Sequence, residues 1–313
     1  MSKRIGILMG GPSSESDISI KSGKAVYSAL MSKGLDAVEV CLDRSQDING
    51  YKDLVKDRIR SLGIDVAFIA MHGEFGEDGF IQSILEDMKI PYTGSKVKAS
   101  QVGMDKIMSK EVFKTCNIPV PRHIILSKTD IDKTADQKVY FNELGLPLVI
   151  KPYNKGSSIG LYIVDKEEEF YPFLEKAFNY SNTVMLEEYI KGREITVGIL
   201  ADRPLPIVEI VPKNKFFDFE AKYNKGLTEY IVPAKMQEKI YKECQNIALL
   251  THKALGADFF SRVDMILSDD TPVVLEINTI PGLTETSLLP KAAKASGMDF
   301  EELAIKILES AKW

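Results

Sequence analysis

An alternation of apolar strands and amphipathic helices at the start of the chain limits its fold more than any other feature. The segment RIGILMGG, residues 4–11, is a short apolar run that ends in glycines. Residues 14–34 then carry apolar side chains at helical spacing and end in a glycine. Further strands are predicted at 36–43 and 64–73, with a helix at 51–63. This order predicts an α/β fold that begins with an open parallel sheet, in which ligands usually bind at the carboxyl ends of the strands.

The organisation changes after KIPYTGSKVKAS, residues 89–100, where proline, glycine and serine predict a domain boundary. A helix is predicted at 105–117, and one long helix is predicted from about Pro233 to Leu255. The remaining strands and a helix around 167–178 give an α+β order. The predicted strands are residues 146–152, 160–165, 183–190, 193–202, 205–212, 259–270 and 272–282.

Composition narrows the class of protein. The 313 residues are 44% hydrophobic and 27% charged, close to the averages of soluble globular proteins. A net charge of -5 argues against general binding to nucleic acid or anionic membranes, so small-molecule partners are expected. The apolar run before Gly10 is too short for a signal peptide, and no run is long enough for a membrane span. Three cysteines without metal spacing favour reduced thiols, and a cytoplasmic location is predicted.

Polar residues interrupt two of the apolar strands near the C-terminus. In VVLEINTIPG, Glu276 and Asn278 are two residues apart, so both side chains leave the same face of a strand. Arg262 and Asp264 have the same spacing in SRVDMIL. A carboxylate with an amide oxygen suits a hard cation such as Mg²⁺. The alternative is a pair of edge strands whose polar faces are solvated.

Two loops are candidates for binding phosphates and a small substrate. In VIKPYNKGSSIG, Lys151 ends a strand, and KGSS at 155–158 forms a short glycine loop whose amides can cover phosphates. The same loop also fits an ordinary β-hairpin turn. The segment AMHGEFGEDGF, residues 70–80, places one histidine, three carboxylates and three glycines after a predicted strand. His72 is interpreted as functional for this reason, whereas His123 and His252 are interpreted as structural.

The order of the motifs resembles a known family. The segments VIKPYNKGSSIG, LEEYIKGREITVGIL, SRVDMIL and LEINTIPGLTETSLLP resemble the ATP-grasp superfamily. GGPSSESDIS, MHGEFGEDGFIQ and FFDFEAKY narrow the resemblance to the D-alanine–D-alanine ligases, over essentially the whole chain. It implies a three-domain ATP-grasp fold: a Rossmann-like open parallel-sheet domain at 1–95, a central domain at 96–185 and a C-terminal domain at 186–313.

The resemblance also implies an activity and its ligands. ATP phosphorylates the carboxylate of one D-alanine, and the amine of a second D-alanine displaces the phosphate, which gives D-alanyl-D-alanine for peptidoglycan synthesis. Two Mg²⁺ ions, for which Mn²⁺ can substitute, assist this reaction. A homodimer formed through the N-terminal domain is implied as well.

Residues for ATP and the metal ions follow from the matched motifs. Lys106 and Lys151 resemble the lysines that hold the phosphates of ATP, and Lys222 matches a residue near the transferred phosphoryl group. The adenine and ribose contacts match the hinge in LEEYIKGRE, at Glu187, the backbone around Ile190, and Glu194. The implied metal ligands are Asp264, Glu276 and Asn278.

Residues for the two D-alanines follow in the same way. His72 and Glu77 match the segment that lies against the first D-alanine, with Glu15 taking its ammonium group. Ser287 and the amide of Leu288 match the pocket for the carboxylate of the second D-alanine. The residues implied in the chemical step are Arg262 and Gly282, which stabilise the tetrahedral oxyanion, and a triad of Tyr223, Ser157 and Glu15 that positions the attacking amine.

Three alternatives stay open from the sequence. The chain fits another ATP-grasp carboxylate–amine ligase of different specificity, although EAKY and SSESDIS argue against it. A regulatory protein that binds nucleotide without catalysis is disfavoured because no matched lysine, arginine or metal ligand is missing. A scaffold protein would leave Glu276 and Asn278 on an apolar strand without compensation. The long aperiodic loop from Pro212 to Tyr230 is predicted to be a lid over bound substrates.

Overall fold

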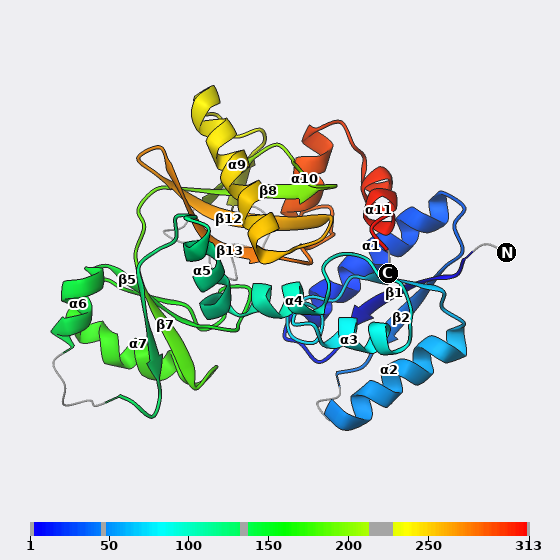
Figure 1. Cartoon of the computed structure of the whole chain (residues 1–313), viewed down its shortest axis with the longest axis horizontal. Helices are drawn as coiled ribbons and strands as arrows, with labels where there is room; N and C mark the ends of the chain where they lie inside the picture. The colour runs from blue at the N-terminus through cyan, green and yellow to red at the C-terminus, as the bar shows by residue number, and fades with distance from the viewer. Residues whose placement is uncertain (1–2, 45–47, 132–136, 213–227, 312–313) are drawn as a thin grey trace.

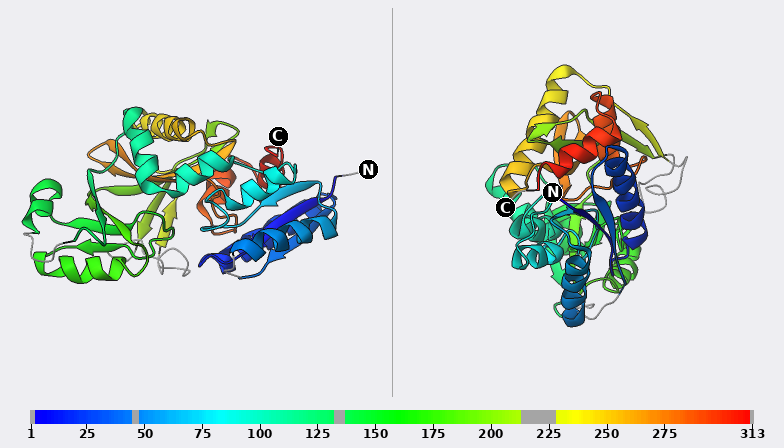
Figure 2. Two further views of the ribbon diagram at one scale, coloured as in Figure 1. Left: turned by 60° about the horizontal axis from the view of Figure 1, so that its bottom comes forward. Right: turned by 90° about the vertical axis from the view of Figure 1, so that its right-hand side faces the viewer.

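The computed structural model describes residues 3–44, 48–131, 137–212 and 228–311. Three β-sheets follow one another along an elongated molecule, with the first and second sheets at opposite ends and the third between them (Figure 1). Both chain ends lie on the side of the first sheet (Figure 2). The predicted α/β class, with an open parallel sheet first and antiparallel sheets after it, is confirmed.

The first sheet is parallel and has the strand order β2(Ala37–Leu42)-β1(Ile5–Gly10)-β3(Val66–Ile69). Every residue of β1 is buried, because its two faces enter different cores. Ile7 and Met9 pack with α1(Ser16–Ser32), and Leu8 packs on the opposite side with α2(Ile48–Leu62) and α3(Phe80–Asp87). Such a strand reads as a continuous apolar run, which is why the sequence identified it.

The second sheet is antiparallel, in the order β4(His123–Ser127)-β7(Thr183–Glu188)-β5(Leu148–Pro152)-β6(Tyr162–Val164). Phe170 and Leu174 of α7(Phe170–Ala177) fill its core, next to α6(Lys138–Leu144) and the 3₁₀ turn η1(Glu167–Glu169). Two helices, α4(Val97–Met104) and α5(Lys106–Thr115), connect the first sheet to the second. The Asp105 carboxylate caps α5 by accepting hydrogen bonds from the amides of Ile107 and Met108.

The third sheet has the order β11(Thr228–Ile231)-β10(Val208–Pro212)-β8(Arg193–Leu200)-β12(Phe260–Ser268)-β13(Thr271–Asn278), and the short β9(Arg203–Pro204) pairs with β8. The helix α9(Glu238–Leu255) covers it. Its predicted start at about Pro233 is wrong by one turn, because the amide of Ala234 still donates to the carbonyl oxygen of Ile207 and the helix begins only after Gln237.

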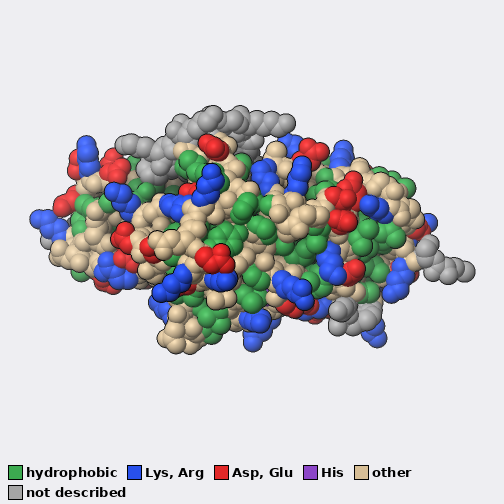
Figure 3. Space-filling model, turned by 90° about the horizontal axis from the view of Figure 1, so that it is seen from above, with side chains coloured by type: hydrophobic (Ala, Val, Ile, Leu, Met, Phe, Trp, Pro, Cys, Tyr) green, Lys and Arg blue, Asp and Glu red, His purple; other side chains and the backbone are tan. Residues whose placement is uncertain are grey.

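Two C-terminal helices, α10(Leu288–Ala295) and α11(Phe300–Leu308), were not predicted from the sequence. Leu289, Leu303 and Ile307 share one apolar core with β1 and α1, so the end of the chain returns to the first sheet. Basic and acidic side chains intermingle on the face seen in Figure 3. Within the described ranges, no helix combines the length and apolar character that a membrane span requires. Cys41, Cys116 and Cys244 are free thiols.

Candidate active site

A cavity of about 1320 Å³ lies where the three sheets meet. Every predicted site residue within the described part of the chain lines it. These residues are Glu15, His72, Glu77, Lys106, Lys151, Ser157, Glu187, Ile190, Glu194, Arg262, Asp264, Glu276, Asn278, Gly282, Ser287 and Leu288. The remaining two, Lys222 and Tyr223, lie outside the described residues, as does most of the predicted lid. His123 and His252, interpreted as structural, are not part of the cavity wall.

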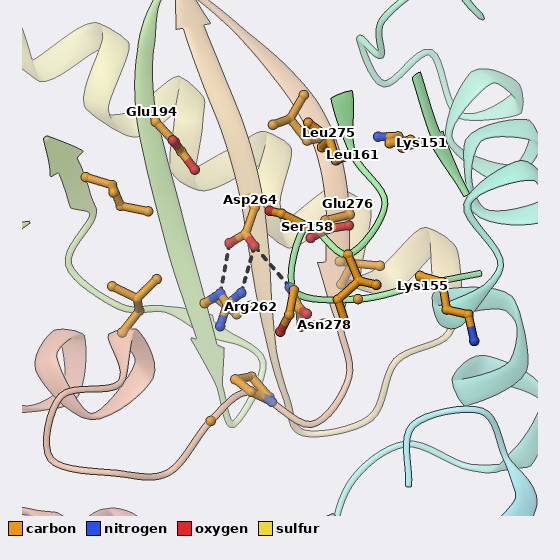
Figure 4. A pocket seen from close by; sticks show the side chains of 18 of the residues that line it. Lys151, Lys155, Ser158, Leu161, Glu194, Arg262, Asp264, Leu275, Glu276 and Asn278 are labelled. Atoms are coloured by element: carbon orange, nitrogen blue, oxygen red, sulfur yellow. Dashed lines mark hydrogen bonds and ion pairs between the residues drawn. The ribbon is translucent and has the colours of Figure 1, made fainter. Parts of the chain in front are cut away.

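The polar pairs of β12 and β13 lie side by side on adjacent strands, and all four residues line this cavity. Antiparallel pairing places Arg262 opposite Asn278 and Asp264 opposite Glu276. Arg262 donates from Nε and Nη2 to the two carboxylate oxygens of Asp264, at 2.8 Å each (Figure 4). Because β12 lies between β8 and β13, the alternative of two solvated edge strands is wrong for β12; β13 is at the edge of its sheet.

The Asp264 carboxylate has further partners that fix its position. The hydroxyl group of Thr196 on β8 donates to its Oδ1 at 2.6 Å, and Nδ2 of Asn278 donates to its Oδ2 at 3.1 Å. Thr196 was not identified from the sequence, since a threonine on a buried strand carries no signal of its own. With four donors around it, Asp264 holds the guanidinium of Arg262 in one planar orientation.

The side-chain oxygens on β12 and β13 are suitable ligands for a magnesium ion that is also bound by phosphate oxygens. Asp264, Glu276 and Asn278 supply carboxylate and amide oxygens, which Mg²⁺ prefers. Among the residues that the structure describes, no group of three or more His, Cys, Asp or Glu side chains could hold a metal ion alone. Mg²⁺ is usually bound by one or two carboxylates, with substrate phosphates and water completing its shell, so this set suits a nucleotide-bound ion.

Lys106, the first residue of α5, connects the acidic strands to the glycine loop. Its Nζ lies 3.1 Å from Oε2 of Glu276 and donates to the carbonyl oxygen of Lys155 at 2.7 Å. The ammonium group therefore sits between a proposed metal ligand and a proposed phosphate-binding loop. An incoming triphosphate would meet a lysine whose position is already fixed.

A buried cluster of three charges lies beside Lys106. Oε1 of Glu187 is 2.8 Å from Nζ of Lys110, and its Oε2 is 2.6 Å from Nζ of Lys151. The side chains of Lys110 and Glu187 are only 1% and 3% exposed. Burial raises the pKa of Glu187, but the two lysines outweigh it and hold that pKa at about 2. Burial lowers the pKa of Lys110 to about 8, against the opposing charge of Glu187.

Glu187 was predicted to belong to the adenine hinge. In the structure its two carboxylate oxygens contact two lysines, Lys110 and Lys151. Lys110 was missed by the sequence analysis. Its one signal is the spacing of four residues from Lys106, which places both on the same face of α5. The cluster carries a net charge of +1, because two ammonium groups face one carboxylate. That excess positive charge is available to an anionic ligand in the cavity.

The family resemblance implies that Lys151 binds the phosphates of ATP. On that basis, replacing Lys110 with methionine is expected to raise the KM for ATP about tenfold, because Glu187 would then neutralise Lys151 completely. A fall of a few degrees in the melting temperature is also expected, since Oε1 of Glu187 loses its buried partner. Lys114→Met is the matched control, because Lys114 lies one turn further along α5, 47% exposed and paired with Glu111. An unchanged KM for ATP in Lys110→Met would contradict the role of the cluster.

His72 is a buried imidazole with a hydrogen-bond partner at each ring nitrogen. Its Nδ1–H donates to the carbonyl oxygen of Ile280 at 3.1 Å, since a carbonyl can only accept. Its Nε2 therefore accepts from the hydroxyl group of Ser22 at 2.9 Å, and the amide of Leu283 donates to Ser22 at 3.2 Å. Burial lowers the pKa of His72, although Glu15 opposes the shift. Ser22, on α1, is a third residue that the sequence analysis missed, after Thr196 and Lys110.

Glu15 lies where two glycine loops meet. A Cβ at Gly73, whose φ is +70°, would lie 2.7 Å from Oε2 of Glu15, and one at Gly156 would lie 3.0 Å from the same oxygen. The hydroxyl group of Ser157 donates to Oε1 of Glu15. Burial, and then the charge of Glu15, raise the pKa of Glu77, which accepts from the amide of Gly73 at 2.7 Å. The carboxyl group of Glu77 therefore loses its proton at a higher pH than an ordinary glutamate does.

The N-terminus of α10 forms the last wall. Ser287 is the N-cap residue of this helix, and its Oγ accepts from the amide of Thr284 at 3.0 Å. A Cβ at Gly282 would lie 2.8 Å from that Oγ, so a larger residue would push the serine away. Free amides at a helix N-terminus favour an anion, which agrees with a carboxylate pocket at Ser287 and Leu288.

Comparisons with known proteins agree with this geometry. The family models described as the D-ala D-ala ligase N-terminus and C-terminus match residues 4–95 and 112–309. The chain is 44% identical to D-alanine–D-alanine ligase from Geotalea uraniireducens, over 99% of this chain and 96% of the relative. It is similar in structure to the D-alanine–D-alanine ligase from Bacillus anthracis complexed with ATP, with a TM-score of 0.85, 35% identity and coverage of 99% and 97%. VanG D-Ala:D-Ser ligase from Enterococcus faecalis aligns with a TM-score of 0.83, 27% identity and complete (100%) coverage of both chains.

Proposed function

The chain belongs to the D-alanine–D-alanine ligase family, and from this premise we propose how its cavity joins two D-alanines at the expense of ATP. The reaction forms D-alanyl-D-alanine for peptidoglycan synthesis. The convergence of side chains from all three sheets on one cavity is the observation that supports this proposal most strongly.

The nucleotide is assigned to the space between the second and third sheets. Lys106 and Lys151 bind its phosphates, and the buried cluster around Glu187 supplies the excess positive charge that favours them. The hinge backbone around Ile190 is assigned to the base and Glu194 to the ribose hydroxyls, and both residues line the cavity. Asp264, Glu276 and Asn278 would hold two Mg²⁺ or Mn²⁺ ions, which supply charge neutralisation for phosphoryl transfer when bound.

The first D-alanine is assigned to the loops of the first sheet. Glu15 binds its ammonium group, beside His72, whose pKa burial lowers, and Glu77, whose pKa is raised by burial and then by the charge of Glu15. The carboxylate of this D-alanine points toward the nucleotide and accepts the transferred phosphoryl group. The resulting acyl phosphate hydrolyses in contact with water, so the cavity must exclude water until the second substrate reacts.

The second D-alanine is assigned to the N-terminus of α10. Ser287 and the amide of Leu288 hold its carboxylate, and its amine attacks the acyl carbon. Arg262 and the amide of Gly282 stabilise the oxyanion of the tetrahedral intermediate before phosphate leaves. Lys222 near the phosphoryl group, and Tyr223 with Ser157 and Glu15 as a triad that positions the amine, complete the assignment by family resemblance.

The wider organisation is proposed on the same basis. The domain limits are 1–95, 96–185 and 186–313, although the core that α10 and α11 share with α1 joins the last domain to the first. A homodimer through residues 1–95 and a cytoplasmic location are supported by the family resemblance. No nucleic acid or membrane partner is proposed for a chain of net charge -5.

Incubation with ATP, Mg²⁺ and D-alanine is expected to yield ADP, phosphate and D-alanyl-D-alanine in equal amounts. Phosphate release and product mass are the measurements, with L-alanine as the control and D-serine as a competing acceptor. Equal activity with L-alanine, or formation of AMP, would refute the function. A predominance of D-alanyl-D-serine would instead favour the alternative of an ATP-grasp ligase of different specificity.

A further inference from the structure

An ion pair joins two loops that come from different sheets and meet at the cavity. Nζ of Lys155, in the glycine loop after β5, contacts Oε1 of Glu74, in the loop after β3. Lys155 lines the cavity, whereas Glu74 is not part of the cavity wall. The side chain of Lys155 extends away from the Arg262–Asp264 pair (Figure 4). The proposed reaction so far leaves both residues without a role.

The loops that carry this pair also meet around Glu15. Gly73 precedes Glu74 and Gly156 follows Lys155, and a Cβ at these glycines would lie 2.7 Å and 3.0 Å from Oε2 of Glu15. Ser157, two residues after Lys155, donates to the other oxygen of Glu15. The Lys155–Glu74 ion pair therefore lies beside the hydrogen bond between Ser157 and Glu15 and joins the same segments of the chain.

The glycine loop is held on its other side by the nucleotide site. The carbonyl oxygen of Lys155 accepts from Nζ of Lys106, which also pairs with Glu276. Ser157 and Ser158 have φ values of 51° and 59°, in the left-handed region that L-residues rarely adopt. Such a backbone persists only where surrounding contacts fix it. Glu74 and Lys106 contact the neighbouring Lys155, and Glu15 accepts from Ser157.

We propose that Glu74 and Lys155 are positioning residues, whose ion pair holds the glycine loop against the first sheet and so keeps Ser157 on Glu15. This inference rests on the proposed ligase function. Glu74 also neutralises the charge of Lys155. When the pair is broken, the loop moves away from the first sheet and admits water to the acyl phosphate.

Water that reaches the acyl phosphate would hydrolyse it. Water attacks the acyl carbon in place of the second amine, a new carbon–oxygen bond forms, and the bond from that carbon to the phosphate oxygen breaks. The products are D-alanine and phosphate, with ATP consumed and no dipeptide formed. The amount of phosphate released per dipeptide is therefore a direct measure of loop opening.

Charge reversal tests the ion pair. Each single variant places like charges opposite each other, and the double variant exchanges the two residues and restores the pair. Glu74→Lys and Lys155→Glu are each expected to lower kcat/KM for D-alanine about tenfold, since like charges then face each other. Phosphate per dipeptide should rise well above one in both. The double variant Glu74→Lys/Lys155→Glu restores an opposite-charge pair and should recover both measures to within about threefold of the wild type.

Lys56→Glu is the matched control. Lys56 has the same exposure as Lys155, 23%, and also pairs with an acid on another element, Asp87, but lies outside the cavity wall. It should leave both measures unchanged. A double variant as impaired as Lys155→Glu would overturn the inference, because it would mean that Lys155 acts on the substrates directly. A wild type that forms no dipeptide would instead overturn the proposed function and this inference with it.

Discussion

Glu276→Gln is expected to lower kcat at least about 1000-fold at millimolar Mg²⁺, because a bound metal ion contributes several kcal/mol to phosphoryl transfer. Glutamine keeps the size of the side chain and one oxygen, but it removes the negative charge that attracts the ion. The fold should survive, since Glu276 is a partly exposed residue on β13, the edge strand of the third sheet. Part of the activity should return at high Mg²⁺, because Asp264 and Asn278 keep their oxygens.

Binding measurements separate the metal role from a role in packing. The affinity for ATP should depend on Mg²⁺ in the wild type and much less in Glu276→Gln, as measured by calorimetry with and without the ion. Glu39→Gln is the control, since Glu39 also lies on a strand, β2, but outside the cavity wall. A Glu276→Gln variant with normal activity and unchanged Mg²⁺ dependence would show that Glu276 is not a ligand.

The pairing of polar residues on β12 and β13 shows what a local pattern can predict. A strand alternates its side chains between two faces, so the spacing of two residues was enough to place Glu276 with Asn278, and Arg262 with Asp264. The spacing says nothing about which strand lies next to which. Only the register of the sheet brings Asp264 opposite Glu276 and makes one site of the two pairs.

Contacts between segments that are far apart in the sequence could not be predicted from the local spacing of residues. Ser157 and Glu15 are 142 residues apart, and their proximity was expected from the family resemblance alone. Lys110 was missed because the sequence does not show whether a lysine is buried. Glu187 becomes its partner only when β7 and α5 pack together. The helices α10 and α11 were missed because they are short, with 8 and 9 residues, and depend on packing against other segments.

Arg262→Lys is expected to lower kcat about 100- to 1000-fold, the loss typical of removing one oxyanion donor. Lysine keeps the positive charge, so the KM for ATP should change little. It cannot reproduce the two parallel hydrogen bonds by which the guanidinium is oriented on Asp264, at 2.8 Å each. Asp264 keeps its hydrogen bonds from Thr196 and Asn278, so the melting temperature should stay close to that of the wild type.

A single-turnover experiment locates the step at which Arg262→Lys fails. If Arg262 stabilises the tetrahedral intermediate of amine attack, ADP should still form in the first turnover, whereas D-alanyl-D-alanine should appear slowly. Arg122→Lys is the control, because Arg122 pairs with a carboxylate, Glu188, at 2.7 Å but lies outside the cavity wall. A variant that forms dipeptide at the normal rate would remove Arg262 from the chemical step. Loss of ADP formation itself would assign Arg262 to phosphoryl transfer instead, since only that step precedes the attack.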